Sequence, residues 1–369
     1  MTDSSCSRRH RAGLAGLAVV ALTALAGCAP ERQTEAAPAV SRAPSSGTAA
    51  EATPSLGEPT PVVEGLTTPW SVAFADGTAL VSQRDTGEIL EVLDGGTRVV
   101  GEIPSATPGG EGGLLGIAAR DGYLYAYATT ADDNRVLRLP LEGAPGALRL
   151  GSAQTVIDGI PSANIHNGGR IAFGPDDMLY ITAGDASEPD AAQDPDSLGG
   201  KILRVAPDGA VPSDNPFAGS PVWSLGHRNP QGIGWDAAGT MYASEFGQNT
   251  WDELNVIAPG ANYGWPEVEG IGGREGYVDP VQQWAPAEAS PSGLAVVDGA
   301  VVIANLRGQR VRVVPTGDPS SAADFFVGEF GRLRDVVAAP DGSLWVVTSD
   351  TDRSGGDTDA ILRVPLERD

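Results

Sequence analysis

The chain has 369 residues, and its 24 Lys and Arg against 48 Asp and Glu give a formal net charge of −24. So acidic a chain lacks the basic surface that binds nucleic acid, and we expect no nucleic-acid partner. Its 49 Gly and 29 Pro, beside 41% hydrophobic residues, favour many short strands and turns over long helices.

Residues 1–28 are typical of an export signal. Three arginines precede an apolar run over residues 12–27, which is short for a membrane span and suits a signal peptide. The run ends in Leu-Ala-Gly-Cys, which resembles a bacterial lipobox with Cys28 as the acylated residue. We therefore predict a protein exported to the outer face of the cytoplasmic membrane, where the lipid on Cys28 is its membrane contact. An ordinary signal peptide with an incidental cysteine is the alternative.

The region after the signal is expected to be a tether. Residues 29–59 are rich in Ala, Pro, Ser and Thr, a composition typical of flexible linkers. The chain has two cysteines, Cys6 and Cys28, and processing would leave Cys28 alone, so we predict no intramolecular disulfide. The folded domain is then expected over residues 60–369.

A repeated phrase divides this domain into six copies. Each copy has a turn of the Asp-Gly kind, an alternating apolar strand and a second strand, and the turns begin at residues 76, 121, 176, 236, 298 and 341. Each copy is long enough for the four short strands of a propeller blade, typically ~40–50 residues. The pattern predicts an all-β, six-bladed β-propeller, since a sandwich would not explain six copies. Residues 61–66 precede the first copy, and we expect them to add the outer strand of the last blade.

Two polar loops in the longer copies suggest catalysis. His166 lies on a glycine-flanked loop just before a predicted strand, and Asp185 follows the next strand. Pairing of these strands as a hairpin would bring the two side chains together as the carboxylate–imidazole pair of a general base. A polar loop with a capped Asp is the alternative.

Arginines are scarce in this acidic chain, so their grouping is informative. Arg332 and Arg334 project to the same face of an extended segment, and Arg307 follows the strand of the fifth copy. With Arg228, from the segment Gly-His-Arg-Asn-Pro-Gln-Gly, they would form a site for a ligand with several carboxylates. Salt bridges to the abundant Asp and Glu are the alternative for each arginine.

A metal site is indicated near residue 250. Residues 245–253 offer carboxylates and exposed carbonyls within nine positions, the oxygen-rich ligation that calcium accepts. Zinc is improbable, because the processed chain offers two histidines in the folded region and no cysteine there.

These segments together resemble a known family. The ordered phrases EGGLLGIA (111–118), HNGGRIAFGPDDMLYITAGD (166–185), GHRNPQG (226–232), DELN (252–255), NYGWP (262–266) and RLRDVVAAPDG (332–342) resemble the soluble glucose and aldose sugar dehydrogenases that depend on pyrroloquinoline quinone (PQQ), also called glucose/sorbosone dehydrogenases. The resemblance runs over nearly all of residues 60–369 and implies a six-bladed propeller.

The resemblance also implies roles for single residues. His166 matches the base that takes the proton of the anomeric hydroxyl, and Asp185 the carboxylate that orients it. The residues that match PQQ contacts are Arg228, Asn229, Arg307, Arg332 and Arg334. The carbonyls of Gly247 and Gln248 match the ligands of a calcium ion under PQQ. Glu253 and the carbonyl of Tyr263 match the ligands of a second calcium ion. It implies oxidation of an aldose to a lactone, with electrons passed to an external acceptor.

The sugar-binding half matches less well. Glu111 stands where the glucose enzymes have glutamine, Ile165 stands where they have an acidic residue, and the loop after Asp185 is short. The generic aldose branch is therefore the better match, with Glu111 as a substrate contact. A calcium-dependent propeller lactonase and a lipid-anchored binding propeller without catalysis are the alternatives. The first would not need four arginines, and the second would not need His166 with Asp185.

Overall fold

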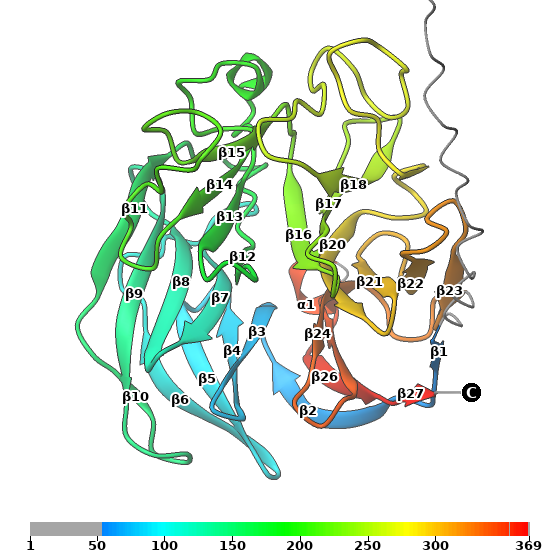
Figure 1. Ribbon diagram of the computed structural model, residues 1–369. Helices are drawn as coiled ribbons and strands as arrows, with labels where there is room; N and C mark the ends of the chain where they lie inside the picture. Colours follow the sequence, from blue (N-terminus) through cyan, green and yellow to red (C-terminus); the bar gives the residue numbers. More distant parts are fainter. Residues whose placement is uncertain (1–53, 354, 368–369) are drawn as a thin grey trace, which may run out of the picture. The chain divides into compact units, whose positions relative to one another are not determined.

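Six antiparallel sheets make up almost the whole of the structure, a computed structural model that describes residues 54–353 and 355–367 (Figure 1). The predicted signal, Cys28 and most of the predicted tether lie outside the described residues. Each sheet is one blade of the propeller, and the blades are numbered 1 to 6 along the chain from the first complete copy of the repeat. The strands of each blade are given from the innermost, next to the central channel of the propeller, to the outermost.

Blade 1 contains β3 (Pro69–Ala75), β4 (Thr78–Gln83), β5 (Glu88–Leu93) and β6 (Gly96–Glu102). Blade 2 contains β7 (Leu114–Arg120), β8 (Tyr123–Thr129), β9 (Asn134–Glu142), β10 (Arg149–Leu150) and β11 (Gln154–Ile160). Blade 3 contains β12 (Ile171–Phe173), β13 (Leu179–Ala183), β14 (Lys201–Val205) and β15 (Val222–Leu225). Blade 4 contains β16 (Pro230–Trp235), β17 (Met241–Glu245), β18 (Asp252–Ile257) and β19 (Gln282–Trp284). Blade 5 contains β20 (Pro291–Val297), β21 (Ala300–Asn305), β22 (Arg310–Pro315) and β23 (Ala323–Phe325). Blade 6 contains β24 (Leu333–Ala338), β25 (Leu344–Thr348), β26 (Asp359–Val364) and β2 (Thr60–Leu66).

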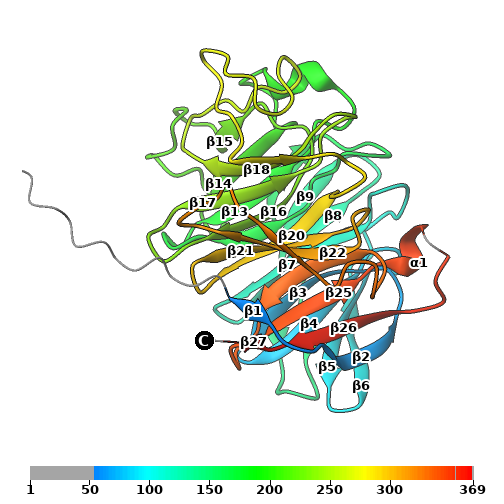
Figure 2. The same ribbon diagram turned by 90° about the vertical axis from the view of Figure 1, so that its right-hand side faces the viewer.

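The innermost strands close a ring. β3 contacts β7, β7 contacts β12, and the contacts continue through β16, β20 and β24 back to β3. Figure 2 shows the strands of successive blades stacked beside one another. The six-bladed all-β propeller predicted from the repeats is therefore confirmed.

The last blade combines both ends of the domain. β2 pairs antiparallel with β26, so the segment before the first copy supplies the outer strand of blade 6, as predicted. Without β2, the outer edge of β26 would be an exposed sheet edge, and this closure gives it a partner.

The folded unit begins earlier than predicted. β1 (Ser55–Leu56) pairs with β27 (Leu366–Glu367), and Leu56 is buried among the hydrophobic residues of blades 5 and 6. Residues 55–59 therefore belong to the propeller and not to a tether. The apolar side chain of Leu56 explains the difference, because burial removes it from water.

The repeated turns join the two innermost strands of each blade. Asp76 and Gly77 both have positive φ, 47° and 84°, the geometry of the tight turn that joins β3 to β4. Trp70 lies near the start of β3 and Arg84 directly follows β4, so both are at the strand ends away from this turn. Strands of six or seven residues span roughly 20 Å, so the turns and these two residues lie at opposite ends of the blade.

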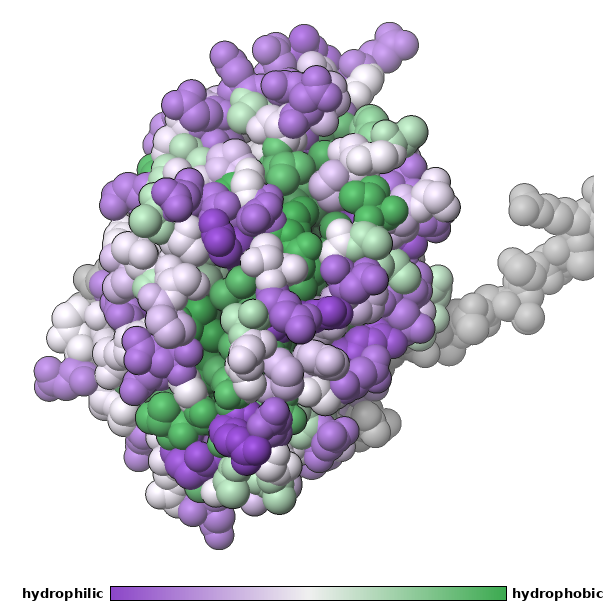
Figure 3. Space-filling model, turned by 90° about the vertical axis from the view of Figure 1, so that its left-hand side faces the viewer, coloured by the Kyte–Doolittle hydropathy of each residue, from purple (hydrophilic) through white to green (hydrophobic). Residues whose placement is uncertain are grey.

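Apolar side chains between neighbouring blades form the core, in several clusters that each join adjacent sheets. On the face that Figure 3 shows, hydrophilic side chains predominate on both sides of a narrow band of hydrophobic ones. The structure has two short helical segments, η1 (Pro189–Ala192) and α1 (Asp350–Arg353), and no helix among the described residues has the length and apolar character to cross a membrane.

Candidate active site

His166 and Asp185 meet as the sequence predicts. The Nδ1 atom of His166 lies 2.7 Å from Oδ1 of Asp185, whose side chain is fully buried. Burial opposes ionisation of Asp185, but the hydrogen bond and the charge interaction with His166 outweigh it and lower the pKa of this carboxyl. An ionised Asp185 makes Nδ1 the protonated nitrogen, so Nε2 of the neutral ring is the one that can accept a proton.

The local fold brings these two residues together. β12 and β13 pair as a hairpin, with His166 before the first strand and Asp185 after the second. At Gly184 a Cβ atom would lie 2.0 Å from the carbonyl oxygen of His166, so only glycine permits this approach. His166 itself has φ of 61°, an uncommon conformation for a residue other than glycine. Such strain is typical of functional positions.

Trp265 is a third member of this group that the sequence did not predict. Its indole Nε1 donates a 2.9 Å hydrogen bond to Oδ2 of Asp185, and its carbonyl accepts one from Gln193. Nearby, the ammonium group of Lys201 donates to the carbonyls of Ala191, Ala192 and Gly199, and burial lowers its pKa to about 8. The loop after Asp185 is thus fixed by internal hydrogen bonds.

A cavity of about 200 Å³ opens where the innermost strands begin and the second strands end. Its lining residues come from five of the six blades: Trp70, Arg84, Glu111, Gln231, Phe246, Ser290, Leu306, Arg307, Arg332, Arg334 and Asp352. Arg307, Arg332 and Arg334 therefore converge as predicted, whereas Arg228, the fourth arginine of the predicted set, does not line this cavity. Four arginines against two carboxylates give this cavity a positive excess in an otherwise acidic chain, which suits an anionic ligand.

Buried charges in the channel lie beside this cavity. The Arg170 guanidinium packs 4.3 Å from the centre of the Trp70 ring, and its Nη1 lies 2.8 Å from Oδ2 of Asp335. The Arg334 guanidinium lies 5.9 Å from the same ring centre. Gly293 leaves room for the carboxylate of Asp335, because a Cβ at this position would lie 1.8 Å from Oδ1 of Asp335.

Glu111 connects the cavity to the His166–Asp185 pair. Its carboxylate lines the cavity and accepts a 2.9 Å hydrogen bond from the backbone N–H of His166. The predicted substrate contact is therefore beside both the predicted base and the arginines.

Arg228 and Asn229 lie next to this junction. Nη1 of Arg228 donates to the carbonyl of Gly247 at 2.5 Å and to that of Phe246 at 3.3 Å. Burial is the main cause that lowers the pKa of Arg228, with Asp185 and Glu245 opposing it. Among the described residues, Nε of Arg228, Nδ2 of Asn229 and Nε of Arg334 are buried donors without a protein partner. Unpaired buried donors are costly unless a ligand or water accepts from them.

The loop that carries Gly247 and Gln248 is held from one side. Oε1 of Glu269 accepts hydrogen bonds from the N–H groups of four successive residues, Gln248, Asn249, Thr250 and Trp251. In a trans peptide the carbonyl points opposite to the N–H that follows it. The carbonyls of Gly247 and Gln248 therefore point away from Glu269, and that of Gly247 faces Arg228.

Glu253 is set in a buried acidic environment. It pairs across the sheet with Glu245, and burial first and Glu245 second raise its pKa to about 8. The ring of Tyr263 stacks on His227 at 4.7 Å, and Nδ1 of His227 lies 2.8 Å from Oε2 of Glu245. Two neighbouring buried carboxyls suit a divalent cation. In the part of the chain that the structure describes, no three His, Cys, Asp or Glu side chains group as a metal site, so the predicted sites depend on carbonyls.

Sequence reasoning missed Arg84 and Asp352. Arg84 directly follows β4, as Leu306 and Arg307 follow β21, so aligning the first copy with the fifth could have found it. Asp352 belongs to α1, between β25 and β26, and nothing in its local sequence signals a site.

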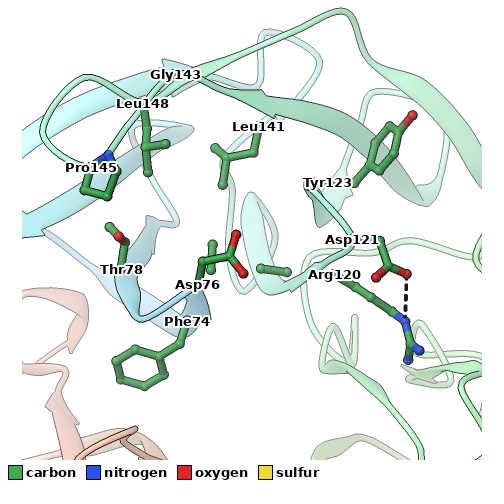
Figure 4. Close-up of a pocket in the computed structure, with 13 residues that line it drawn as sticks. Phe74, Asp76, Thr78, Arg120, Asp121, Tyr123, Leu141, Gly143, Pro145 and Leu148 are labelled. Carbon is green, nitrogen blue, oxygen red and sulfur yellow. Dashed lines mark hydrogen bonds and ion pairs between the residues drawn. The ribbon is translucent and has the colours of Figure 1, made fainter.

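Another cavity lies at the opposite ends of blades 1 and 2 (Figure 4). Its volume is about 230 Å³, and its walls include the Asp76 and Asp121 turns together with Phe74 and Leu148. Arg120 there pairs with Asp121 at 3.3 Å and with Asp177 at 2.7 Å. The His166–Asp185 pair and the converging arginines are not part of it.

Comparisons with known proteins agree with this geometry. The family model described as "Glucose / Sorbosone dehydrogenase" matches residues 66–361. The PQQ-bound structure of an aldose sugar dehydrogenase from Streptomyces coelicolor is 49% identical, with a TM-score of 0.82, over 86% of this chain and 100% of that one.

Curated relatives are more distant. The quinoprotein glucose dehydrogenase B of Acinetobacter calcoaceticus is 31% identical over 58% of this chain and 54% of its own. The aldose sugar dehydrogenase YliI of Escherichia coli K12 is 28% identical over 77% of this chain and 87% of its own. Because the family model covers far more than half of the sequence, the chain belongs to the glucose/sorbosone dehydrogenase family.

Proposed function

We propose that this protein oxidises aldose sugars at the anomeric carbon to lactones, with PQQ and calcium bound in the channel and an external acceptor for the electrons. The observation that carries the proposal is the junction at Glu111, which joins the His166–Asp185 pair to the arginine-lined cavity. The PQQ-bound relative and the quinoprotein name of another support it.

The residues present fit PQQ, which carries several carboxylates and a quinone. Arg307, Arg332 and Arg334 would hold its carboxylates, while the unpartnered donors of Arg228 and Asn229 would face its polar atoms. When bound, PQQ supplies an electrophilic acceptor for the hydride of the sugar carbon. His166 accepts the anomeric hydroxyl proton on Nε2, and Asp185 holds its ring in place and stabilises the resulting imidazolium.

Calcium would add positive charge beside Arg228, held by the carbonyls of Gly247 and Gln248. Arg228 would stabilise negative charge that develops on an oxygen in the channel. A propeller lactonase would not need this concentration of arginine, and a solved gluconolactonase is similar only in fold, with 14% identity.

Reconstitution tests the proposal. Purified protein freed of ligands is mixed with PQQ and calcium chloride, and the quinone absorbance and dye reduction are followed with a panel of aldoses. Aldose-dependent dye reduction that requires PQQ is the expected result. Failure to bind PQQ, or binding without any aldose-dependent reduction, would contradict the proposal.

A second calcium, at Glu253 and the carbonyl of Tyr263, should stabilise the protein without PQQ. Calcium at 100 times its dissociation constant would add about 2.7 kcal/mol to the free energy of unfolding. We expect Glu253→Gln to abolish the calcium-dependent rise in melting temperature. The metal-free variant should melt near the metal-free wild type, since a pKa of about 8 keeps Glu253 largely protonated at pH 7.

As a control, Glu142→Gln, which removes the carboxylate of a partly exposed ion pair with Arg149, should keep the calcium response. A full response in Glu253→Gln would place the ion elsewhere.

We also propose that Cys28 carries a lipid anchor. The lipobox-like segment before it supports this, and the several acyl chains of a bacterial lipoprotein provide the multiple anchors that stable attachment needs. Cys28→Ala is expected to move the protein from the membrane fraction to the soluble fraction of fractionated cells. A variant that stays in the membrane fraction, with normal removal of its signal, would contradict the anchor.

A further inference from the structure

Asp352 lies among three arginines of the cavity. Its carboxylate is 2.8 Å from Nη1 of Arg84, 3.1 Å from Nη2 of Arg334 and 3.8 Å from Nη2 of Arg332. The side chain of Asp352 is only 4% exposed, and those of Arg84 and Arg334 are 7% and 6% exposed. This buried carboxylate thus lies among three guanidinium groups whose like charges repel one another, and Arg84 also pairs with Asp85 at 2.7 Å.

The segment around Asp352 is anchored from two sides. The carboxylate of Asp359 accepts the N–H groups of Asp350 at 2.6 Å and Thr351 at 3.2 Å. Oδ1 of Asp350 accepts the N–H of Arg332 at 3.0 Å, which ties the segment to the start of β24. Asp352 is therefore a fixed part of the cavity wall.

The arginines keep capacity for a further anion. Arg334 uses Nη2 for Asp352 and Nη1 for Gln231, at 3.0 Å, while its buried Nε has no partner within the described chain. Burial, together with the like charges of Arg84 and Arg332, lowers the pKa of Arg334 to about 10, and Asp352 is the main group opposing this. Asp352 is therefore the main carboxylate that offsets the like charges around Arg334.

We propose that Asp352 is a built-in counter-carboxylate, which neutralises the arginine cluster when PQQ is absent and lowers the affinity of the cluster for PQQ. The proposal rests on the function proposed above. The cavity is lined by four arginines against Glu111 and Asp352, and Asp85, which pairs with Arg84 at 2.7 Å from outside the lining, leaves an excess of one positive charge. Replacing Asp352 by asparagine keeps its shape and one acceptor oxygen but raises this excess to two. The carboxylates of PQQ would then supply the missing negative charge.

The test compares wild type and Asp352→Asn in calcium buffer. PQQ binding is titrated by calorimetry, and melting temperatures are measured with and without PQQ. We expect the PQQ-free variant to melt at a lower temperature, to bind PQQ on the order of tenfold more tightly, and to gain more in melting temperature on binding than wild type does. As a control, Asp324→Asn removes a carboxylate from Arg310 and Arg312 in the outer strands of blade 5, and its PQQ affinity should not change.

Each outcome decides the proposal. Equal or weaker PQQ binding by Asp352→Asn overturns it and makes Asp352 a scaffold for the arginines. If the variant folds only with PQQ present, PQQ release is measured instead, and slower release than from wild type is expected. A variant that does not fold even with PQQ also overturns the proposal, because the cofactor then cannot replace the carboxylate. Wild type that does not bind PQQ would disprove the proposed function itself.

Discussion

Substitution of His166 by glutamine is expected to lower the turnover of the reconstituted enzyme by about 10²–10⁴-fold, the usual contribution of general-base catalysis. The amide of glutamine can still hydrogen-bond to Asp185, but it cannot accept a proton from a hydroxyl group at neutral pH. Steady-state dye reduction with an aldose measures the loss. PQQ and calcium binding should be retained, because neither predicted ligand set includes His166.

Two further measurements connect this loss to proton transfer. An aldose deuterated at the anomeric carbon should show a primary isotope effect when hydride transfer limits the rate. In Asp185→Asn, Nδ1 of His166 loses the carboxylate that lies 2.7 Å away and orients the ring, so turnover should fall in this variant as well. A His166→Gln enzyme that reduces dye with aldose at near the wild-type rate would disprove the assigned role.

The blade pattern was predictable because it is local. Asp-Gly turns join strands adjacent in sequence, and Gly77 and Asp76 have the positive φ that such turns require. The beginning of the domain was less predictable, since Leu56 becomes part of the core only through β27, at the far end of the chain. Composition alone does not show such a pairing.

The same distinction applies to the site. His166 and Asp185 are 19 residues apart on one hairpin, so their pairing follows from local strand order. Trp265 reaches Asp185 across 80 residues, and Arg84 reaches Asp352 across 268. These contacts depend on the ring of blades and on loop conformations, so the sequence pattern could not predict them. The family resemblance named candidate ligand residues but did not include the groups that hold those side chains in position.

The arginine cluster gives the second large expected effect. Arg334→Ala removes a guanidinium that is buried beside Trp70 and whose Nε has no partner within the described chain. Charge-assisted hydrogen bonds contribute about 1.5–3 kcal/mol, so we expect PQQ affinity to fall roughly ten- to a hundred-fold. Arg332→Ala should weaken binding in the same direction. Titration of the ligand-free variants with PQQ in calcium buffer measures the change, and excess PQQ should restore part of the activity.

Arg312→Ala distinguishes this effect from general destabilisation. Arg312 is as well buried as Arg334, at 6% side-chain exposure, and it packs 4.7 Å from the Trp284 ring centre and pairs with Asp324, away from the cavity. Its loss should lower the melting temperature without changing PQQ affinity. If Arg332→Ala and Arg334→Ala both bind PQQ as wild type does, the arginines serve only their salt bridges to Asp352. If Asp352 opposes PQQ binding as proposed, Arg334→Ala with Asp352→Asn should bind PQQ more tightly than Arg334→Ala alone, because the double variant regains positive excess in the cavity.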